Sequence, residues 1–316
     1  MSSINTNIAA NSALQALTAT QRDMTQTQNR IATGYRVATA QDNAAYWSIA
    51  TTMRSDNGAL STVKDALGLG SATADVAYTG INNGIKLLDQ IKQKLVAARE
   101  PGVDRTKIQS DITALQAQLQ STADSASFSG QNWLKIDSTA GTDITKAIVS
   151  SFSRDSSNNV SVGTIAVSLY TASTGDTAAL YDSNTTASAK AGLLDKQQTA
   201  TSGATFTIAS LDIHSLTDSA ADLGDLDSYI TAVDSTISKM TTAATNFGSV
   251  KSRIDLQKSF VSDLKTAIDT GVSGLVDADM NEESTKLQAL QTKQSLGIQS
   301  LSIANQSSQS ILRLFQ

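Results

Sequence analysis

Eight apolar residues recur every seven positions between residues 226 and 275, without an interruption. They are Leu226, Val233, Met240, Phe247, Ile254, Val261, Ile268 and Leu275. Seven residues make nearly two turns of an α-helix, so these side chains form one stripe along one face of a helix. At 1.5 Å of rise per residue, the stripe is about 75 Å long. Such a length predicts a helical rod or coiled coil rather than a small globular bundle.

Two further segments carry the same kind of stripe. One has Leu60, Leu67, Ala74, Ile81, Leu88 and Leu95 at intervals of seven, and the next has Ile108, Ile112, Leu115, Leu119 and Ala126. Narrow apolar stripes on long helices are buried by packing against one another. We therefore expect a chain that folds back on itself, with residues 45–135 and 222–275 forming a long-helix rod domain and the middle inserted as a lobe.

The two ends of the chain have weaker stripes, and we expect helices over residues 4–31 and 284–315. Polar residues, among them Gln21, Gln28 and Gln294, interrupt them. Such helices are marginal alone in water. We predict that residues 1–44 and 276–316 pair with each other and with other copies of the chain. The predicted interface residues are Ile4, Ile8, Leu14, Leu17, Met24, Ile31, Leu287, Leu290, Leu301, Ala304, Asn305, Ile311, Leu314 and Phe315.

Residues 136–221 differ in character, because Ser, Thr, Gly and Asp are dense there. Short alternating runs at 160–162, 164–170 and 204–208 predict strands, and 187–194 reads as a short helix. The predicted fold class is therefore mainly α: a long coiled-coil-like helical rod built from the N- and C-terminal segments, with a small inserted β-rich lobe.

Composition excludes several classes of function. The net charge of −5 and the absence of a basic cluster argue against nucleic acid as a partner. No apolar run approaches the roughly 18–20 residues that span a bilayer, so no membrane partner is predicted. Cysteine is absent, and the N-terminus lacks the pattern of a cleavable signal peptide.

Candidate catalytic and metal-binding residues are few. His214 is the only histidine, so a zinc site is not expected, and an ordinary surface histidine is the favoured reading. Asp277, Asp279 and Asn281 have calcium-loop spacing, but Glu282 and Gln288 replace the required Gly and Glu. The acidic residues there fit a helix start better. We predict no enzyme activity, no metal and no cofactor.

Motifs at both ends resemble one family. They are Ile4–Asn7, Arg30–Val37, Asp42–Ala45, Asn246–Gly248 with Arg253, Asp277–Asp279 with Glu283, and Ala304–Gln306 with Gln309, Ile311, Leu312 and Leu314. Together they resemble bacterial flagellin over roughly residues 1–135 and 222–316. Tyr46 stands where the family usually has Gly, and Ser308 where it usually has Pro, so the chain resembles a divergent member.

This resemblance implies a structural subunit that polymerises into the flagellar filament used for swimming, with the terminal helices ordering on assembly. It implies export through the flagellar type III channel without a cleaved signal, an extracellular location, and a flagellar cap, hook-junction proteins and an export chaperone as partners. The family motif Arg-Glu-Leu, which a vertebrate innate receptor binds, is replaced by Lys92–Lys94, which puts that recognition in doubt.

Two alternatives remain open at this stage. A hook–filament junction protein shares the terminal motifs, although the well-matched C-terminus favours flagellin. An enzyme or adhesin displayed on a rod would carry its activity in residues 136–221. The lobe lacks nucleophile and metal motifs, but its many Ser and Thr residues are compatible with an adhesin or a glycan-bearing surface.

Overall fold

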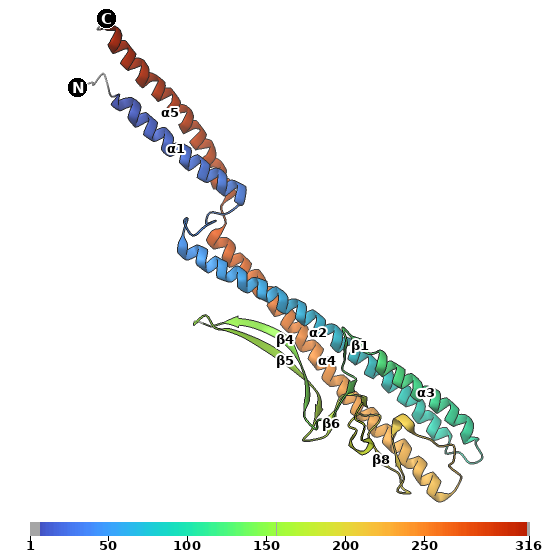
Figure 1. Cartoon of the computed structure of the whole chain (residues 1–316). Helices are drawn as coiled ribbons and strands as arrows, with labels where there is room; N and C mark the ends of the chain where they lie inside the picture. The colour runs from blue at the N-terminus through green and yellow to red at the C-terminus, as the bar shows by residue number, and fades with distance from the viewer. Residues whose placement is uncertain (1–6, 156, 315–316) are drawn as a thin grey trace. The chain divides into compact units, whose positions relative to one another are not determined.

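Long helices dominate the structure, a computed structural model that describes residues 7–155 and 157–314, with side chains up to Gln306. The helices are α1 (Ile8–Thr33), α2 (Ala44–Ala97), α3 (Arg105–Ser125), α4 (Ala220–Val276) and α5 (Met280–Leu314) (Figure 1). The strands lie between α3 and α4. The predicted fold class, mainly α with an inserted β-rich lobe, is confirmed.

Two compact units make up the chain. The terminal unit contains residues 1–58 and 265–316, and the long-helix unit contains residues 59–264. The terminal unit thus extends beyond the ranges 1–44 and 276–316 expected for the terminal helices. The residues at 136–221 lie in the same unit as most of α2 and α4, because they pack on these helices.

The apolar stripes of α2 and α4 form the core of the long-helix unit. Exposure is 2% or less for every heptad residue named above between Leu60 and Leu95 on α2 and between Leu226 and Val261 on α4. On α3, Ile112 and Leu119 are buried, whereas Ile108 and Leu115 are only half-buried. The buried face of α3 also includes Gln116 and Ala123, so it is rotated away from the face that Ile108 and Leu115 occupy.

Glycine allows the closest contacts within this core. A Cβ atom at Gly84 of α2 would lie 2.7 Å from the Met240 Cε atom of α4. At Gly70, a Cβ would lie 2.6 Å from Cγ2 of Ile148. Gly70 and Gly84 are therefore positions where neighbouring side chains approach the α2 backbone.

A long antiparallel hairpin is the largest β element. It joins β4 (Ile144–Arg154) and β5 (Val160–Thr171), with β6 (Asp176–Thr177) along the other edge of β5. Both predicted runs at 160–162 and 164–170 belong to β5, and β4 was not predicted. The hairpin contacts the helices through Ile148 at Gly70 and through Gln257 of α4, whose Nε2 donates to the Ser150 carbonyl at 3.0 Å.

Smaller strand pairs complete the lobe and its approach. They are β1 (Ser127–Phe128) with β2 (Gln131–Asn132), β3 (Lys135–Ile136) parallel to β7 (Tyr181–Asp182), and β8 (Gln198–Thr199) with β9 (Thr205–Phe206).

The short helix expected at 187–194 is wrong beyond one 3₁₀ turn, η1 (Ala187–Ala189). Leu193 and Leu194 instead donate their backbone N–H groups to the carbonyls of Ala179 and Leu180.

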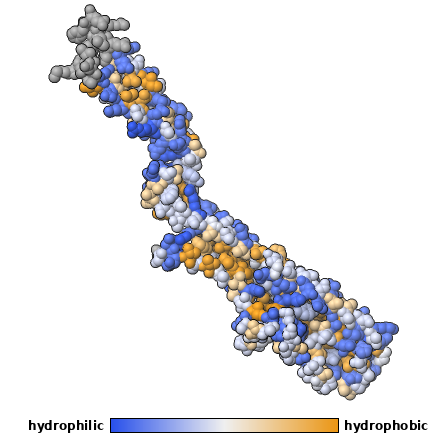
Figure 2. All heavy atoms as spheres, viewed as in Figure 1, coloured by the Kyte–Doolittle hydropathy of each residue, from blue (hydrophilic) through white to orange (hydrophobic). Residues whose placement is uncertain are grey.

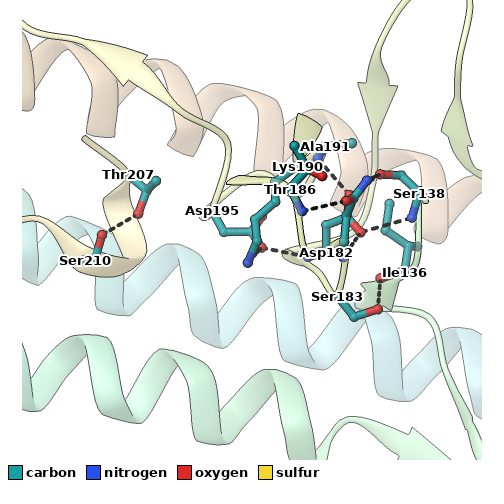
Figure 3. Close-up of polar contacts among 11 residues, drawn as sticks. Ile136, Ser138, Asp182, Ser183, Thr186, Lys190, Ala191, Asp195, Thr207 and Ser210 are labelled. Carbon is teal, nitrogen blue, oxygen red and sulfur yellow. Dashed lines mark hydrogen bonds and ion pairs between the residues drawn. The ribbon is translucent and has the colours of Figure 1, made fainter. Parts of the chain in front are cut away.

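A buried carboxylate holds the segments of this lobe together (Figure 3). Asp182 accepts hydrogen bonds from the backbone N–H groups of Ser138, Asn184 and Ala191 and from the Ser138 hydroxyl. Burial opposes its charge, but these hydrogen bonds outweigh burial and hold the pKa of Asp182 below its usual value. The neighbouring Asp195 accepts from the Asp182 N–H at 2.9 Å, and burial raises its pKa.

Candidate assembly surface on the terminal helices

Helices α1 and α5 lie side by side and run antiparallel (Figure 1). Asn7 caps α1, because its Oδ1 accepts from the Ala10 N–H at 3.0 Å, and its Nδ2 donates to the Ala304 carbonyl of α5 at 3.1 Å. Gly34 ends α1 with φ of 74°, a left-handed conformation that favours glycine. The bond from Asn7 to Ala304 therefore joins the start of α1 to α5.

The contact between α1 and α5 is half polar. Met24 and Leu290 are buried, together with Thr20 and Thr27. Gln294 Nε2 donates to Gln21 Oε1 at 2.8 Å, so the polar residues that interrupt the two stripes satisfy each other. Leu17, Ile31, Leu287, Leu301 and Ala304 are half-buried. One helix pair therefore covers only part of its own apolar surface.

An ion pair joins the last turn of α1 to the first turn of α5. Arg30 Nη1 lies 3.0 Å from Glu283 Oε1, and the Glu283 side chain is only 9% exposed. The other Glu283 oxygen, Oε2, is buried without a hydrogen-bond partner among the described residues. Because both residues sit within motifs noted in the sequence, the pair links the two ends of the chain through positions about 250 residues apart.

Several large apolar side chains remain in water on this helix pair. The exposed fraction is 71% for Ile8, 50% for Leu14, 60% for Leu296, 55% for Ile298 and 67% for Ile303. Figure 2 shows hydrophobic groups at the surface of the α1–α5 pair, interspersed with polar ones. A groove of about 590 Å³ runs along both helices, lined by Leu17, Thr18, Gln21, Arg22, Thr25, Gln26, Asn29, Gln294 and Ile298. Exposed apolar side chains gathered in this way are typical of a surface that binds another protein.

Some predicted interface residues cannot be placed. Ile4 and Phe315 lie outside the described residues, and the side chains of Ile311 and Leu314 do too. Asn305 is exposed. The sequence reasoning missed Leu296, Ile298 and Ile303, because they lie off the seven-residue spacing that passes through Leu287, Gln294 and Leu301. A search for every apolar residue on the helix, rather than for one stripe, would have found them.

The terminal motifs meet where α1 ends and α5 begins. The Ala278 N–H donates to the Gly34 carbonyl at 2.9 Å, and the N–H groups of Arg36 and Val37 donate to the Val276 carbonyl. Val37, Ala50, Val272 and Val276 form a small buried cluster, with the half-buried Ile268 and Leu275 packed on it. The last two heptad residues expected in the rod core thus belong to the terminal unit.

The candidate chemical groups serve local structure. Asp279 begins α5, since its Oδ1 accepts from the N–H groups of Asn281 at 2.8 Å and Glu282 at 3.3 Å. His214 is exposed, and its Nδ1 atom lies 3.5 Å from Oδ2 of Asp212. Among residues 7–155 and 157–314, His and acidic side chains form no group of three that could hold a metal ion. Within that same part of the chain, no helix combines the length and apolarity needed to cross a bilayer.

Comparison with known proteins identifies the family. Residues 4–139 match the bacterial flagellin N-terminal helical region, and residues 230–315 match the bacterial flagellin C-terminal helical region. This chain belongs to the bacterial flagellin family. It is 49% identical to Flagellin C and 43% identical to Flagellin A of Rhizobium meliloti strain 1021, and 41% identical to a flagellin of Brucella melitensis biotype 1. Each alignment covers all of both chains.

Membership gives this flagellin its general role. It is a structural subunit that self-polymerises into the extracellular filament of the bacterial flagellum. These matches favour flagellin over the hook–filament junction alternative. Helix α1 lies within the first matched region, and helix α5 lies within the second.

Proposed function

We propose that the terminal unit of this flagellin completes its folding only when other copies cover the α1–α5 pair. The observation that carries this proposal is the set of five exposed aliphatic side chains, from Ile8 to Ile303, on two paired helices. Each would contribute about 1.5–3 kcal/mol if it were transferred fully from water to an apolar environment. Assembly therefore supplies the stabilisation that one chain lacks.

The polymer follows from the type of contact. A surface that binds a different surface on the next copy, without closing a ring, generates a helical filament. We place α1 and α5 in the inner core of that filament, the long helices around them, and residues 136–221 facing solvent. The interface comprises the residues predicted from sequence together with Leu296, Ile298 and Ile303.

We further propose that the subunit leaves the cell through the flagellar export channel without a cleaved signal peptide. A flagellar cap, hook-junction proteins and an export chaperone would be its partners on this route. The chain's composition supports threading and fast folding, because cysteine is absent and Pro101 is the only proline. The role is structural, without catalysis.

Recognition by the vertebrate innate receptor is not part of this proposal. Lys92 and Lys94 occupy the stretch that corresponds to the family motif Arg-Glu-Leu. Lys92 Nζ lies 2.5 Å from Asp234 Oδ1, and Lys94 Nζ lies 2.5 Å from Asp111 Oδ2. Both ammonium groups are thus engaged in ion pairs within the chain.

Limited proteolysis tests coupled ordering. In monomers, trypsin should cut after Arg22, Arg30, Lys286 and Lys293 within minutes and leave a fragment near residues 45–275. In filaments, the same sites should resist digestion at least tenfold longer, because the open state that trypsin needs is suppressed. Filaments depolymerised by heat and cooled provide the matched control. Equal resistance of the terminal sites in monomer and filament would refute ordering on assembly.

A further inference from the structure

A polar cleft in the long-helix unit is separate from the proposed assembly surface. It lies between the end of β5, β6, the segment 191–198 and α4, and its volume is about 730 Å³. Small-molecule sites in proteins typically occupy about 300–1,000 Å³. Part of its lining is buried and apolar, with Leu169, Leu193 and Ala243 each less than 9% exposed.

Thr236 of α4 contributes a hydroxyl to the wall of this cleft. Thr236 is 2% exposed, and its hydroxyl makes no hydrogen bond within the residues that the structure describes. Its neighbours on α4 behave differently. Thr231, Thr241, Thr242 and Thr245 each donate to the carbonyl four residues earlier, at 2.8–3.2 Å. Because Thr236 lines the cleft, its hydroxyl can bond to a polar group that enters the cleft.

The rim of the cleft carries unneutralised positive charge. Lys196 and Lys239 line it and are exposed, and neither forms an ion pair with any described carboxylate. Asp176 is the one acidic residue in the lining, and Asn246 adds an amide. The excess of positive charge is local, since the whole chain has a net charge of −5. The two lysines favour a bound anion, and the hydroxyl of Thr236 and the amide of Asn246 favour one that also carries hydroxyl groups.

We propose that the cleft binds a uronic acid unit of an acidic polysaccharide. The sugar carboxylate would lie between the ammonium groups of Lys196 and Lys239. Its hydroxyl groups would bond to Thr236 and Asn246, and its C–H face would pack on Leu169 and Ala243.

No aromatic ring lines the cleft, so a single unit is held weakly. A filament repeats the cleft in every subunit, and a long polysaccharide therefore binds by multivalency.

The test uses the full-length monomer, because all the lining residues belong to one chain. Isothermal titration calorimetry at low salt compares a galacturonic acid trimer with a neutral galactose trimer. The acidic trimer should bind at least tenfold more tightly. The double variant Lys196→Gln/Lys239→Gln should lose about tenfold in affinity, since each exposed charge contributes up to about fivefold. Thr236→Val, which keeps the side-chain shape, should lose about fivefold.

A second double variant separates the cleft from general electrostatics. Lys86→Gln/Lys258→Gln removes the same charge from exposed lysines on α2 and α4 that lie outside the cleft. It should change the affinity less than twofold. Circular dichroism melts check that each variant is folded. The proposal is overturned if the two trimers bind equally, if neither binds at millimolar concentration, or if both double variants weaken binding to the same extent.

Discussion

The α1–α5 pair and the α2–α4 pair have seven-residue stripes, yet they bury them to different extents. On α2 and α4, the heptad residues from Leu60 to Leu95 and from Leu226 to Val261 are almost completely buried. On α1 and α5, Met24 and Leu290 are the buried members of the predicted stripes among the side chains from Asn7 to Gln306 that the structure describes, and Gln21 bonds to Gln294 across the pair.

Under the proposed assembly, this difference would let one chain hold both a stable part and a part that binds other copies. The long-helix unit gains a third helix and a β lobe that cover its stripes. Over the described residues, α1 and α5 are covered mainly by each other. A half-polar contact keeps the terminal pair from forming a strong, closed interface, so its remaining apolar surface is available to other copies.

The largest expected effect concerns assembly. Ile8→Asp or Leu301→Asp should reduce filament yield below detection, because burying an unpaired carboxylate costs several kcal/mol per subunit. The melting temperature of the long-helix unit in the monomer should not change. Val96→Asp, at a residue that is 50% exposed in the long-helix unit, is the matched control and should assemble. Electron microscopy and sedimentation measure the yield. A normal yield of filaments from the Ile8 variant would contradict the proposal that this part of α1 lies in the interface between copies.

Leucine truncation in each unit measures the contrast in monomer stability. Leu88→Ala should lower the free energy of unfolding by about 2–5 kcal/mol, because Leu88 is 0% exposed and its removal leaves a cavity. Leu14→Ala, at 50% exposure, should change it by less than about 0.5 kcal/mol. Urea denaturation of the monomer followed by circular dichroism gives both values. Similar losses would mean that the two regions are equally well packed.

The Arg30–Glu283 pair tests the polar part of the terminal contact. Glu283→Gln should weaken the terminal unit by about 1–3 kcal/mol, since a charge-assisted hydrogen bond in a mostly buried site is lost. The effect should appear as a lower temperature of filament depolymerisation. Glu282→Gln alters the exposed neighbour and should have little effect. An unchanged depolymerisation temperature in the Glu283 variant would show that the pair is dispensable.

The smallest expected effect is on how the stability of the fold depends on pH. The pKa of Asp182 is lowered in the fold, so its contribution to stability is present above its unfolded value of 3.8 and is lost as the pH falls through the folded value. Ser138→Ala removes one donor and should cost about 1–2 kcal/mol at pH 7. The cost should shrink below pH 4. Ser153→Ala, at an exposed hydroxyl, should show no such pH dependence in urea titrations of the monomer. A pH-independent cost at Ser138 would contradict the assigned role of Asp182.

Sequence periodicity was sufficient for the helices and insufficient for the lobe. The stripes predicted the helices α1 to α5 to within six residues, apart from the start of α2, which begins at Ala44, 16 residues before the first stripe residue, Leu60. β4 was missed because Ser150, Ser151 and Ser153 disrupt its alternation. The segment 187–194 has helix-forming residues, but the N–H groups of Leu193 and Leu194 donate to the carbonyls of Ala179 and Leu180. That pairing depends on the segment just before β7, and a local sequence pattern does not show which segment lies beside which.

The amino-acid sequence by itself determined where the long helices lie, which residues form their apolar stripes, and to which family the terminal motifs point. These are local properties, because helix formation and side-chain spacing repeat along a single segment. Tertiary structure decided which stripe residues are buried, how Asp182 joins three segments, and which aliphatic groups of α1 and α5 remain in water. Those outcomes depend on contacts between residues that are distant in the chain, and helix periodicity carries no information about which neighbour covers which face.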